Sequence, residues 1–252
     1  MAQAIISDVH ANLEAFKVVL ADIEEQRATD IICLGDLIGY GPNPKECLDM
    51  AVDFDVVILG NHEAALLVQG EGMVFNMRAR GSVDWTRQQL DMLGEDREAN
   101  ARRWNFIGSL DETYMADNIL YVHGTPRDPT GEYLYPKDIY NPDKIIEIFR
   151  MFEWVCMVGH THVPGIWTDE LGYHSPEEVK FKYRLPADEK TIINVGSVGQ
   201  PRDGDPRACY VLRDGDMVTF RKLKYPVLET ATKIANIPDL DRTLAERLLE
   251  GR

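Results

Sequence analysis

The segment VGHTH at 158–162 contains two of the six histidines of the chain, one residue apart. It follows the apolar run WVCMV, which predicts a buried strand. Residues i and i+2 of an extended chain project to the same face, so we expect His160 and His162 to point at one place. Two imidazoles that converge in this way could bind a metal ion. An isolated HxH sequence is also typical of a solvated loop, so the rest of the chain has to decide between the two interpretations.

Other polar residues that suit metal binding also follow apolar runs. Each alone has an ordinary explanation, because aspartate caps helices and aspartate or asparagine forms turns. Structural histidines, however, are not expected to gather behind strands, and five of the six do so, His174 being the exception. The residues of this set are Asp8, His10, Asp36, Asn61, His62, His123, His160 and His162. Together they predict a metal site.

The types of ligand narrow the chemistry. Imidazole, carboxylate and amide oxygen without thiolate favour manganese, iron, nickel, cobalt or zinc, and they disfavour a structural cysteine-type zinc site. The set is larger than one ion needs, but it suits two divalent ions that share a bridging carboxylate. Paired ions about 3.5–4 Å apart promote in-line displacement at phosphorus, by activating a hydroxide and by holding phosphoryl oxygens. We therefore expect two divalent transition-metal ions, manganese first among them, and a small phosphorylated substrate.

The elements that position these residues follow a βαβα pattern. Short runs rich in Ile and Val end in Gly or Ser and predict strands that are covered on both faces, at 4–10, 30–36, 55–61, 118–124, 154–162 and 190–197. Amphipathic segments predict helices at 12–26 with Asn12 as the cap, 43–51, 82–103 and 141–152. In open α/β sheets the loops after the carboxyl ends of strands line the ligand crevice, which is where the polar set lies.

The later part of the chain predicts hairpins and helices. Residues 207–223 predict a hairpin that turns at Asp214–Gly215, and residues 163–190 predict another. Leu240, Leu244 and Leu248 have helical spacing and predict a closing helix.

The chain contains no low-complexity linker and no repeat of solenoid length, so we expect one domain over residues 1–252. Residues 72–103 form a long excursion between two core strands and are expected to be a helical cap over the site. Residues 225–252 are expected to be a helical extension at the C-terminal end.

The composition excludes several classes of partner. The 27 basic and 42 acidic residues give a formal net charge of −15, which disfavours non-specific binding to nucleic acid or anionic membranes. No apolar run is long enough to span a membrane, and the first residues, MAQAIISDVHAN, do not resemble a signal peptide. Four cysteines without a CxxC pair indicate free thiols, so we expect a cytoplasmic protein. The oligomeric state is left open.

The blocks DVH, GDLIGYGPNP, GNHE, HG and GHTH, taken in order, resemble the signature of the calcineurin-like metallophosphoesterase superfamily, from residue 6 to about residue 213. GDLIGYGP and NVGSVGQPRDGDPRA are most similar to its compact bacterial and archaeal phosphodiesterase branch. The resemblance implies an α/β fold in the form of a four-layer α/β/β/α sandwich, with two mixed sheets flanked by helices and the site at the sheet edges.

The resemblance also implies a role for each residue of the polar set. It assigns one ion to Asp8, His10 and His162, the other to Asn61, His123 and His160, and both ions to the bridging Asp36. His62 of GNHE is then not a ligand but the catalytic general acid, or a group that orients the substrate.

Protein serine/threonine phosphatases of the superfamily carry an arginine after the bridging aspartate, in the block GDxxDRG. The corresponding block here is GDLIGYG, without arginine, which disfavours protein phosphatase activity. Arg127 in HGTPRDP and Arg202 in GQPRDGDP are the candidates for holding the phosphate instead. Tyr40 and Tyr133 could stack on a base, or simply pack as core aromatic residues.

These features favour a dinuclear metal-dependent phosphoesterase that hydrolyses a small phosphodiester or phosphomonoester by in-line attack of a metal-bound hydroxide. A dinucleoside polyphosphate hydrolase acting on diadenosine tetraphosphate is a specific alternative. A non-catalytic metal-binding interaction scaffold, of the kind that the superfamily supplies to retromer, is a second alternative, and a metal-responsive regulator without turnover is a third. The scaffold is disfavoured because all eight residues of the polar set are retained.

Overall fold

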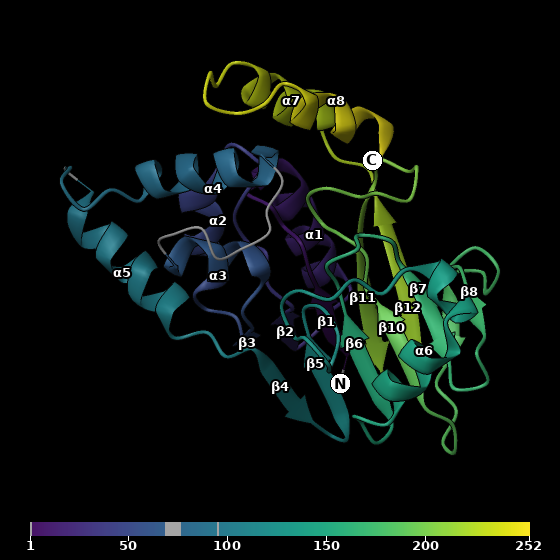
Figure 1. Ribbon diagram of the computed structural model, residues 1–252. Helices are drawn as coiled ribbons and strands as arrows, with labels where there is room; N and C mark the ends of the chain where they lie inside the picture. The colour runs from purple at the N-terminus through teal and green to yellow at the C-terminus, as the bar shows by residue number, and fades with distance from the viewer. Residues whose placement is uncertain (1, 69–76, 95) are drawn as a thin grey trace.

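Two six-stranded sheets form the centre of the protein in a computed structural model that describes residues 2–68, 77–94 and 96–252 (Figure 1). The first sheet has the order β3 (Val56–Val57), β2 (Asp30–Cys33), β1 (Gln3–Ile6), β11 (Ala208–Asp214), β12 (Met217–Leu223) and β9 (Lys182–Arg184). The second has the order β4 (Thr113–Ala116), β5 (Ile119–Val122), β6 (Val155–Val158), β10 (Thr191–Asn194), β7 (Gly165–Thr168) and β8 (Tyr173–His174). Three neighbouring strands in each sheet are parallel, namely β3, β2 and β1 in the first and β5, β6 and β10 in the second. The strands beside them pair antiparallel.

The two sheets face each other and share one apolar core. Ile5 of β1 and Ile32 of β2 belong to the same buried cluster as Tyr121 of β5, Met157 of β6 and Ile193 of β10. The opposite faces of the sheets are also covered, and this explains why the strand segments are continuous apolar runs rather than alternating ones.

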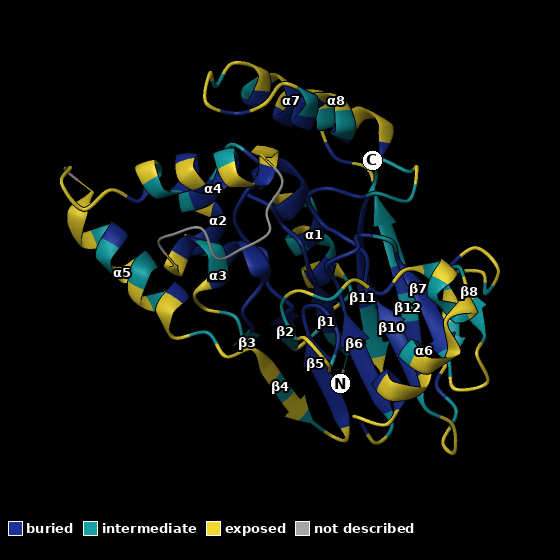
Figure 2. Cartoon of the chain, in the orientation of Figure 1, coloured by how far each residue is buried: buried dark blue, intermediate teal, exposed yellow. Residues whose placement is uncertain are grey.

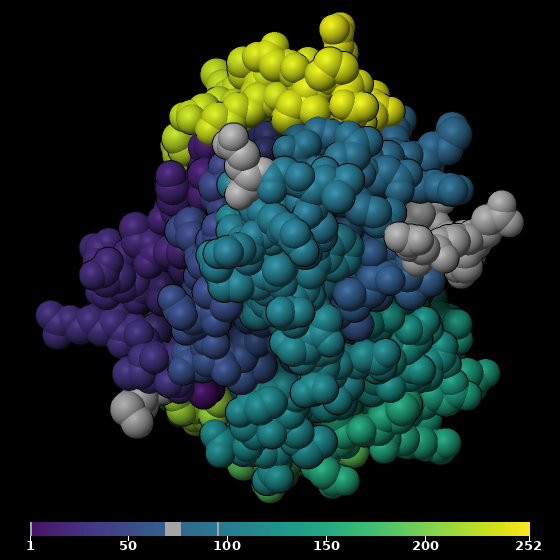
Figure 3. Space-filling model, turned by 90° about the vertical axis from the view of Figure 1, so that its left-hand side faces the viewer, coloured from purple at the N-terminus to yellow at the C-terminus, as the bar shows by residue number. Residues whose placement is uncertain are grey.

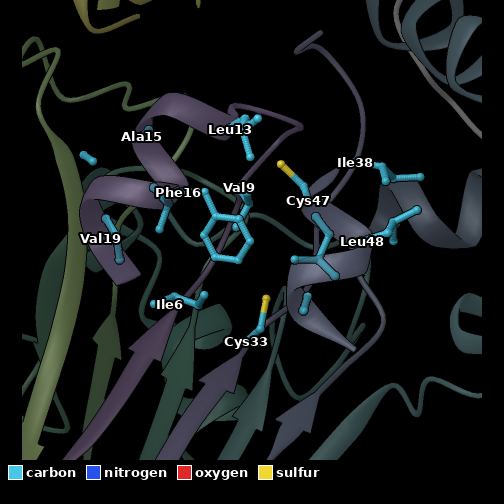
Figure 4. Close-up of a cluster of buried hydrophobic side chains, with 14 of the residues drawn as sticks. Ile6, Val9, Leu13, Ala15, Phe16, Val19, Cys33, Ile38, Cys47 and Leu48 are labelled. Atoms are coloured by element: carbon cyan, nitrogen blue, oxygen red, sulfur yellow. The ribbon is translucent and has the colours of Figure 1, made fainter. Parts of the chain in front are cut away.

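Helices α1 (Leu13–Glu25), α2 (Pro44–Ala51) and α3 (Asn61–Leu67) cover the outer face of the first sheet. Asn12 caps α1 as predicted, because its Oδ1 accepts a hydrogen bond from Ala15 N at 3.1 Å. Figure 4 shows the Phe16 ring in the middle of the side chains buried between α1, α2 and the ends of the strands.

Helix α6 (Pro142–Phe149) and the short 3₁₀-helix η1 (Pro136–Tyr140) cover the outer face of the second sheet. Ile145 and Ile148 of α6 are buried in a cluster with Trp167 of β7 and Ile192 of β10. The order helix, sheet, sheet, helix is the four-layer α/β/β/α sandwich, so the predicted fold class is confirmed.

The segment between β3 and β4 differs from the single helix predicted at 82–103. After α3 the described residues form two helices here, α4 (Met77–Gln89) and α5 (Arg97–Gly108). The side chain of Asp91 accepts a hydrogen bond from Leu93 N at 3.1 Å, a local turn contact that competes with the helix at this point. Residues 72–76 of the predicted cap lie outside the described residues.

One of the two predicted hairpins is confirmed, and the other is confirmed only in part. β11 and β12 pair as predicted, but Asp214 pairs with Met217, so the turn residues are Gly215 and Asp216. Residues 163–190 do not form a single hairpin. β7 and β8 pair in the second sheet, whereas β9 joins the edge of the first sheet beside β12.

The C-terminal segment forms two helices where one was predicted, α7 (Val227–Ala235) and α8 (Thr243–Glu250). Leu244 and Leu248 of α8 are buried as expected, and Leu240 precedes the helix. α7 and α8 lie at the top in Figure 1, and they turn their buried side towards the body of the protein in Figure 2. Figure 3 shows the same segment, in yellow, resting on the blue segment that includes α4.

Cys33, Cys47, Cys156 and Cys209 are all buried and carry free thiols, as predicted. No helix in the described part of the chain is long and apolar enough to cross a membrane.

Candidate metal centre

The predicted polar set comes together where the parallel strands of both sheets end. By element its members are Asp8 and His10 after β1, Asp36 after β2, Asn61 and His62 at the start of α3, His123 after β5, and His160 and His162 after β6. All eight side chains are buried. His174, the histidine that the sequence set apart, is exposed on β8.

His160 and His162 converge on the centre, but not for the reason that the sequence suggested. β6 ends at Val158, and the two residues have φ values of +64° and +60°. The prediction that an extended strand turns both side chains to one face is therefore wrong. Such left-handed backbone is uncommon outside glycine, and it also occurs at Asp8, His10 and Asp36. Strained backbone of this kind concentrates at functional sites.

Close contact between loops holds these conformations in place. The amide of Asp8 donates to Gly35 O at 3.0 Å, and the amide of His160 donates to Asp8 Oδ2 at 3.1 Å. A side chain at Gly159 would begin only 2.1 Å from Ser7 Oγ, so only glycine permits the β1 and β6 loops to approach this closely.

One half of the centre consists of Asp8, His10 and His162. The Nδ1 atoms of the two histidines lie next to main-chain carbonyls, Ile38 O at 3.0 Å and Gln200 O at 2.6 Å. A carbonyl only accepts, so each Nδ1 carries the proton and each Nε2 is a bare lone pair. These two bare Nε2 atoms are 3.2 Å apart, and His162 Nε2 is 3.2 Å from Asp8 Oδ1. These three acceptor atoms repel one another, and a cation between them would remove that repulsion. The group therefore suits a metal ion.

The other half repeats this arrangement with His123, His160 and Asn61. His123 Nδ1 donates to Leu34 O at 2.9 Å, and His160 Nε2 donates to Gly131 O at 3.3 Å. The remaining nitrogens, His123 Nε2 and His160 Nδ1, are therefore bare and face each other at 2.9 Å. Asn61 Oδ1, another acceptor, lies 3.0 Å from His123 Nε2. These three acceptor atoms have no proton to share, so they also suit a cation.

Asp36 lies between the two halves. Its Oδ1 accepts a hydrogen bond from the amide of His62 at 2.9 Å, which fixes the carboxylate. Its Oδ2 is 3.6 Å from His10 Nε2 in one half and 3.5 Å from His123 Nε2 in the other. The same oxygen is 4.0 Å from His62 Nε2. By distance alone, His62 could therefore also be a metal ligand.

Burial determines the charge state of the histidines. Desolvation lowers the pKa values of His10, His62, His123 and His160, and it lowers the pKa of His162 to about 4. The imidazoles are therefore neutral at pH 7, as metal ligands must be.

The two aspartates respond to this environment in opposite ways. Burial raises the pKa of Asp36, and the nearby carboxylates of Glu63 and Asp8 raise it further. Burial would also raise the pKa of Asp8, but the surrounding histidines, His162 first, outweigh it and lower that pKa. A divalent cation would stabilise both carboxylates in their charged form.

Glu63 is a buried residue of the centre that the sequence reasoning missed. It is fully buried, and its carboxylate accepts hydrogen bonds from three amides: Asp36 at 2.8 Å, Ile38 at 3.1 Å and Gly60 at 3.2 Å. Burial raises its pKa to about 7. The signal in the sequence was an acidic residue three positions after the N-cap Gly60, the spacing of a capping box. Glu63 thereby fixes the loop that carries Asp36.

The four candidate substrate contacts differ in their environments. Tyr40 lies against the centre, with its ring 4.5 Å from that of His62, and the guanidinium of Arg202 is 5.8 Å from the Tyr40 ring. Tyr133 stacks on His160 at 3.9 Å. Arg127 instead bonds with Glu132 and Glu147, so carboxylates of the chain already occupy its donors.

Comparison with known proteins identifies relatives over the whole chain. The Calcineurin-like phosphoesterase superfamily domain matches residues 1–216. An uncharacterised protein of Methanocaldococcus jannaschii is 32% identical over 257 residues, which cover 99% of this chain and 98% of that protein.

Two solved structures are also similar. A metallophosphoesterase from Sphaerobacter thermophilus has a TM-score of 0.83 and 35% identity, with 100% of this chain and 99% of that one covered. A hypothetical protein from Pyrococcus horikoshii has a TM-score of 0.76, covers 100% and 98% of the two chains and, at 16% identity, shares the fold alone.

The position of Asp36 predicts that its loss affects both halves of the centre. We expect Asp36→Asn to lower the metal content at both positions, because a neutral amide bridges two cations poorly, whereas His10→Ala should mainly empty one. Metal content per chain after gel filtration measures this, and Asp53→Asn, an exposed aspartate, is the control. Equal loss of metal in the two site variants would contradict the bridging position.

The lowered pKa values of the buried histidines predict how the protein responds to acid. Metal content should stay constant from about pH 8 to about pH 6 and fall below it, because protons compete for the imidazoles only below their ordinary pKa of about 6.5. The metal-free protein should lose stability below about pH 6, because the five buried histidines take up protons at higher pH in the unfolded chain than in the folded one. The raised pKa values of Asp36 and Glu63 act in the opposite direction, and we expect the five histidines to outweigh these two groups.

Metal analysis after desalting and thermal unfolding at each pH measure the two effects, and His174→Asn should change neither. Metal content that stays constant down to about pH 3 would exclude a histidine-dominated site.

Proposed function

Because the chain belongs to the calcineurin-like phosphoesterase superfamily, which depends on divalent metal ions, we propose that it is a dinuclear phosphoesterase acting on a small phosphodiester or phosphomonoester. The observation that carries this proposal is the pairing of bare imidazole nitrogens on both sides of Asp36, 3.2 Å apart in one half and 2.9 Å apart in the other. Two such pairs joined by one carboxylate suit two ions rather than one.

In this proposal each half of the centre holds one ion. Asp8, His10 and His162 bind the first, Asn61, His123 and His160 bind the second, and Asp36 contacts both. Manganese fits this mixture of imidazole and oxygen ligands, and iron, nickel, cobalt and zinc are the alternatives. Two bound ions would supply the activation of water and the charge stabilisation that in-line displacement at phosphorus requires.

His62 is the side chain that we place next to the reacting phosphate without making it a ligand. It packs edge-on against Tyr40, which fixes the plane of its ring. Burial lowers its pKa, so the imidazole is neutral before substrate binds. A bound phosphate dianion or monoanion favours the protonated form, in which His62 can donate a proton to the departing oxygen. In the neutral form it orients the phosphate through its N–H.

Two further properties belong to this proposal. The eight retained, buried polar residues support catalysis over a scaffold role, and the block GDLIGYG without arginine supports a small substrate over a phosphoprotein. Four buried free thiols support a reducing, cytoplasmic location.

A substrate panel tests the function. Metal-free protein would be reconstituted with Mn²⁺ and assayed with bis-p-nitrophenyl phosphate, p-nitrophenyl phosphate and diadenosine tetraphosphate. We expect turnover of at least one ester and about two ions per chain. Absence of turnover on all three would favour the scaffold or the regulator, and one ion per chain would contradict the dinuclear centre.

His62→Asn tests the role of the catalytic histidine. If His62 protonates the leaving oxygen, the variant should lose about 10²–10⁴-fold in kcat on alkyl phosphate esters, because an alkoxide leaves poorly without a proton. The loss on p-nitrophenyl esters should be much smaller, since p-nitrophenolate leaves readily. The metal content should be unchanged, and His174→Asn is the matched control. Loss of an ion would make His62 a ligand, and equal loss on both esters would leave it an orienting group.

A further inference from the structure

Three aromatic rings at the candidate centre are in mutual contact. The Tyr40 ring lies 4.6 Å from that of His10 and 4.5 Å from that of His62, and the two imidazole rings are 4.8 Å apart. Tyr40 is buried, with 8% of its surface exposed, so it meets its neighbours rather than solvent. It therefore packs against one half of the metal centre and against the histidine that we place beside the phosphate.

The main chain next to Tyr40 also contacts the His62 ring. Gly39 has a φ of +85°, and a side chain at this position would begin 2.1 Å from His62 Nδ1, so only glycine permits this approach. Tyr40 itself has left-handed backbone, with a φ of +60°. This conformation is uncommon for a bulky residue and persists only where surrounding contacts fix it. The segment that contacts His62 therefore needs support from other elements.

Helix α4 and the C-terminal helices supply this support. A cavity lined by Tyr40, Ile234 of α7 and Leu248 of α8, among others, measures only about 10 Å³, which is room for about one water molecule. The ring of Tyr40 is therefore closely packed on this side. It belongs to a buried cluster whose other members among the described residues all lie on α4 or in the C-terminal segment, namely Ala79, Trp85, Ala231, Ile234, Leu240, Leu244, Ala245 and Leu248.

The C-terminal helices are fixed to the rest of the protein at both ends of the segment. Thr230 Oγ1 of α7 is buried and donates a hydrogen bond to Glu14 Oε2 of α1 at 2.7 Å. After α8, the carbonyl of Gly251 accepts a hydrogen bond from Gly204 N at 2.9 Å. The match to the family domain ends at residue 216, so the two helices lie outside that match although they pack against a residue of the centre.

We propose that Tyr40 is a positioning residue that fixes the His62 ring, and that α4, α7 and α8 hold Tyr40 in place for this role. The inference rests on the proposed function and deepens it, because it makes the C-terminal helix pair a part of the catalytic site. Tyr40 then acts through His62 instead of stacking on a base. His62 can orient or protonate the phosphate group only if its ring keeps one direction, since small displacements of a catalytic group are costly.

A double-mutant cycle on orthophosphate binding tests the inference, with Mn²⁺-loaded protein and isothermal titration calorimetry. Tyr40→Leu removes the ring and should weaken phosphate binding roughly tenfold, the usual effect of losing a hydrogen bond to a charged group. The same change in a His62→Asn background should have little further effect, because the imidazole that Tyr40 positions is already absent. Tyr40→Phe keeps the ring and should retain most of the affinity.

Leu248→Ala tests the contribution of the C-terminal helices, because it enlarges the cavity beside Tyr40 without changing a residue of the centre. It should also weaken phosphate binding, and it should lose this effect in the His62→Asn background. Ile148→Ala is the matched control, since Ile148 of α6 is buried beneath the outer face of the second sheet, and it should leave the affinity unchanged. Metal content and thermal unfolding midpoints show that the variants remain loaded and folded.

The crystal structure of Tyr40→Leu provides a second measurement, which needs neither phosphate nor turnover. We expect the His62 ring to rotate or to occupy more than one orientation while the metal ligands stay in place. An unmoved His62 ring, or an effect of Tyr40→Leu on phosphate affinity that is the same with and without His62, would overturn the inference. A protein that hydrolyses no ester but shows the displaced ring and the coupled loss of affinity would refute only the proposed function.

Discussion

The centre depends on four main-chain carbonyls that decide where the histidine protons lie. Ile38 O, Leu34 O, Gln200 O and Gly131 O each receive one imidazole N–H, which leaves the opposite nitrogen of each ring bare. These carbonyls come from loops of both sheets. The sandwich must therefore bring the two sheets into fixed register before the bare nitrogens can face each other. In metalloproteins such outer contacts orient the ligands and tune their basicity.

Fixing these loops has a conformational cost that close main-chain contacts offset. Asp8, His10, Asp36, His160 and His162 all have left-handed backbone, which costs roughly 1–3 kcal/mol at each such residue. Glycine allows the main chains of these loops to come into contact. A side chain at Gly199 would begin 1.7 Å from Val9 O. The carboxylate of Glu63 adds three amide contacts to the loop of Asp36. The same left-handed backbone also occurs away from the centre, for example at Arg27 and Leu171, but five of the polar residues of the centre share it.

The sequence predicted the strands and the polar set because both follow from local patterns. Continuous Ile and Val runs indicate covered strands, and polar residues behind them indicate a crevice. The sequence did not predict features that depend on contacts with main-chain segments far away along the chain. The directions of His160 and His162 follow from loop contacts with Asp8, and the role of Glu63 follows from amides that the chain brings to it only after folding.

The pairing of β1 with β11 also has a consequence for how the protein is made. Gln3 pairs with Arg213 and Ile5 with Val211, so the strand that leads to Asp8 and His10 finds one of its two neighbours about two hundred residues later. A ribosome releases residues at about 5–20 per second, so the first strand waits for at least ten seconds before that partner emerges. Contacts of such long range also slow folding once the chain is free. We expect the nascent chain to acquire its ions only after synthesis has passed β11.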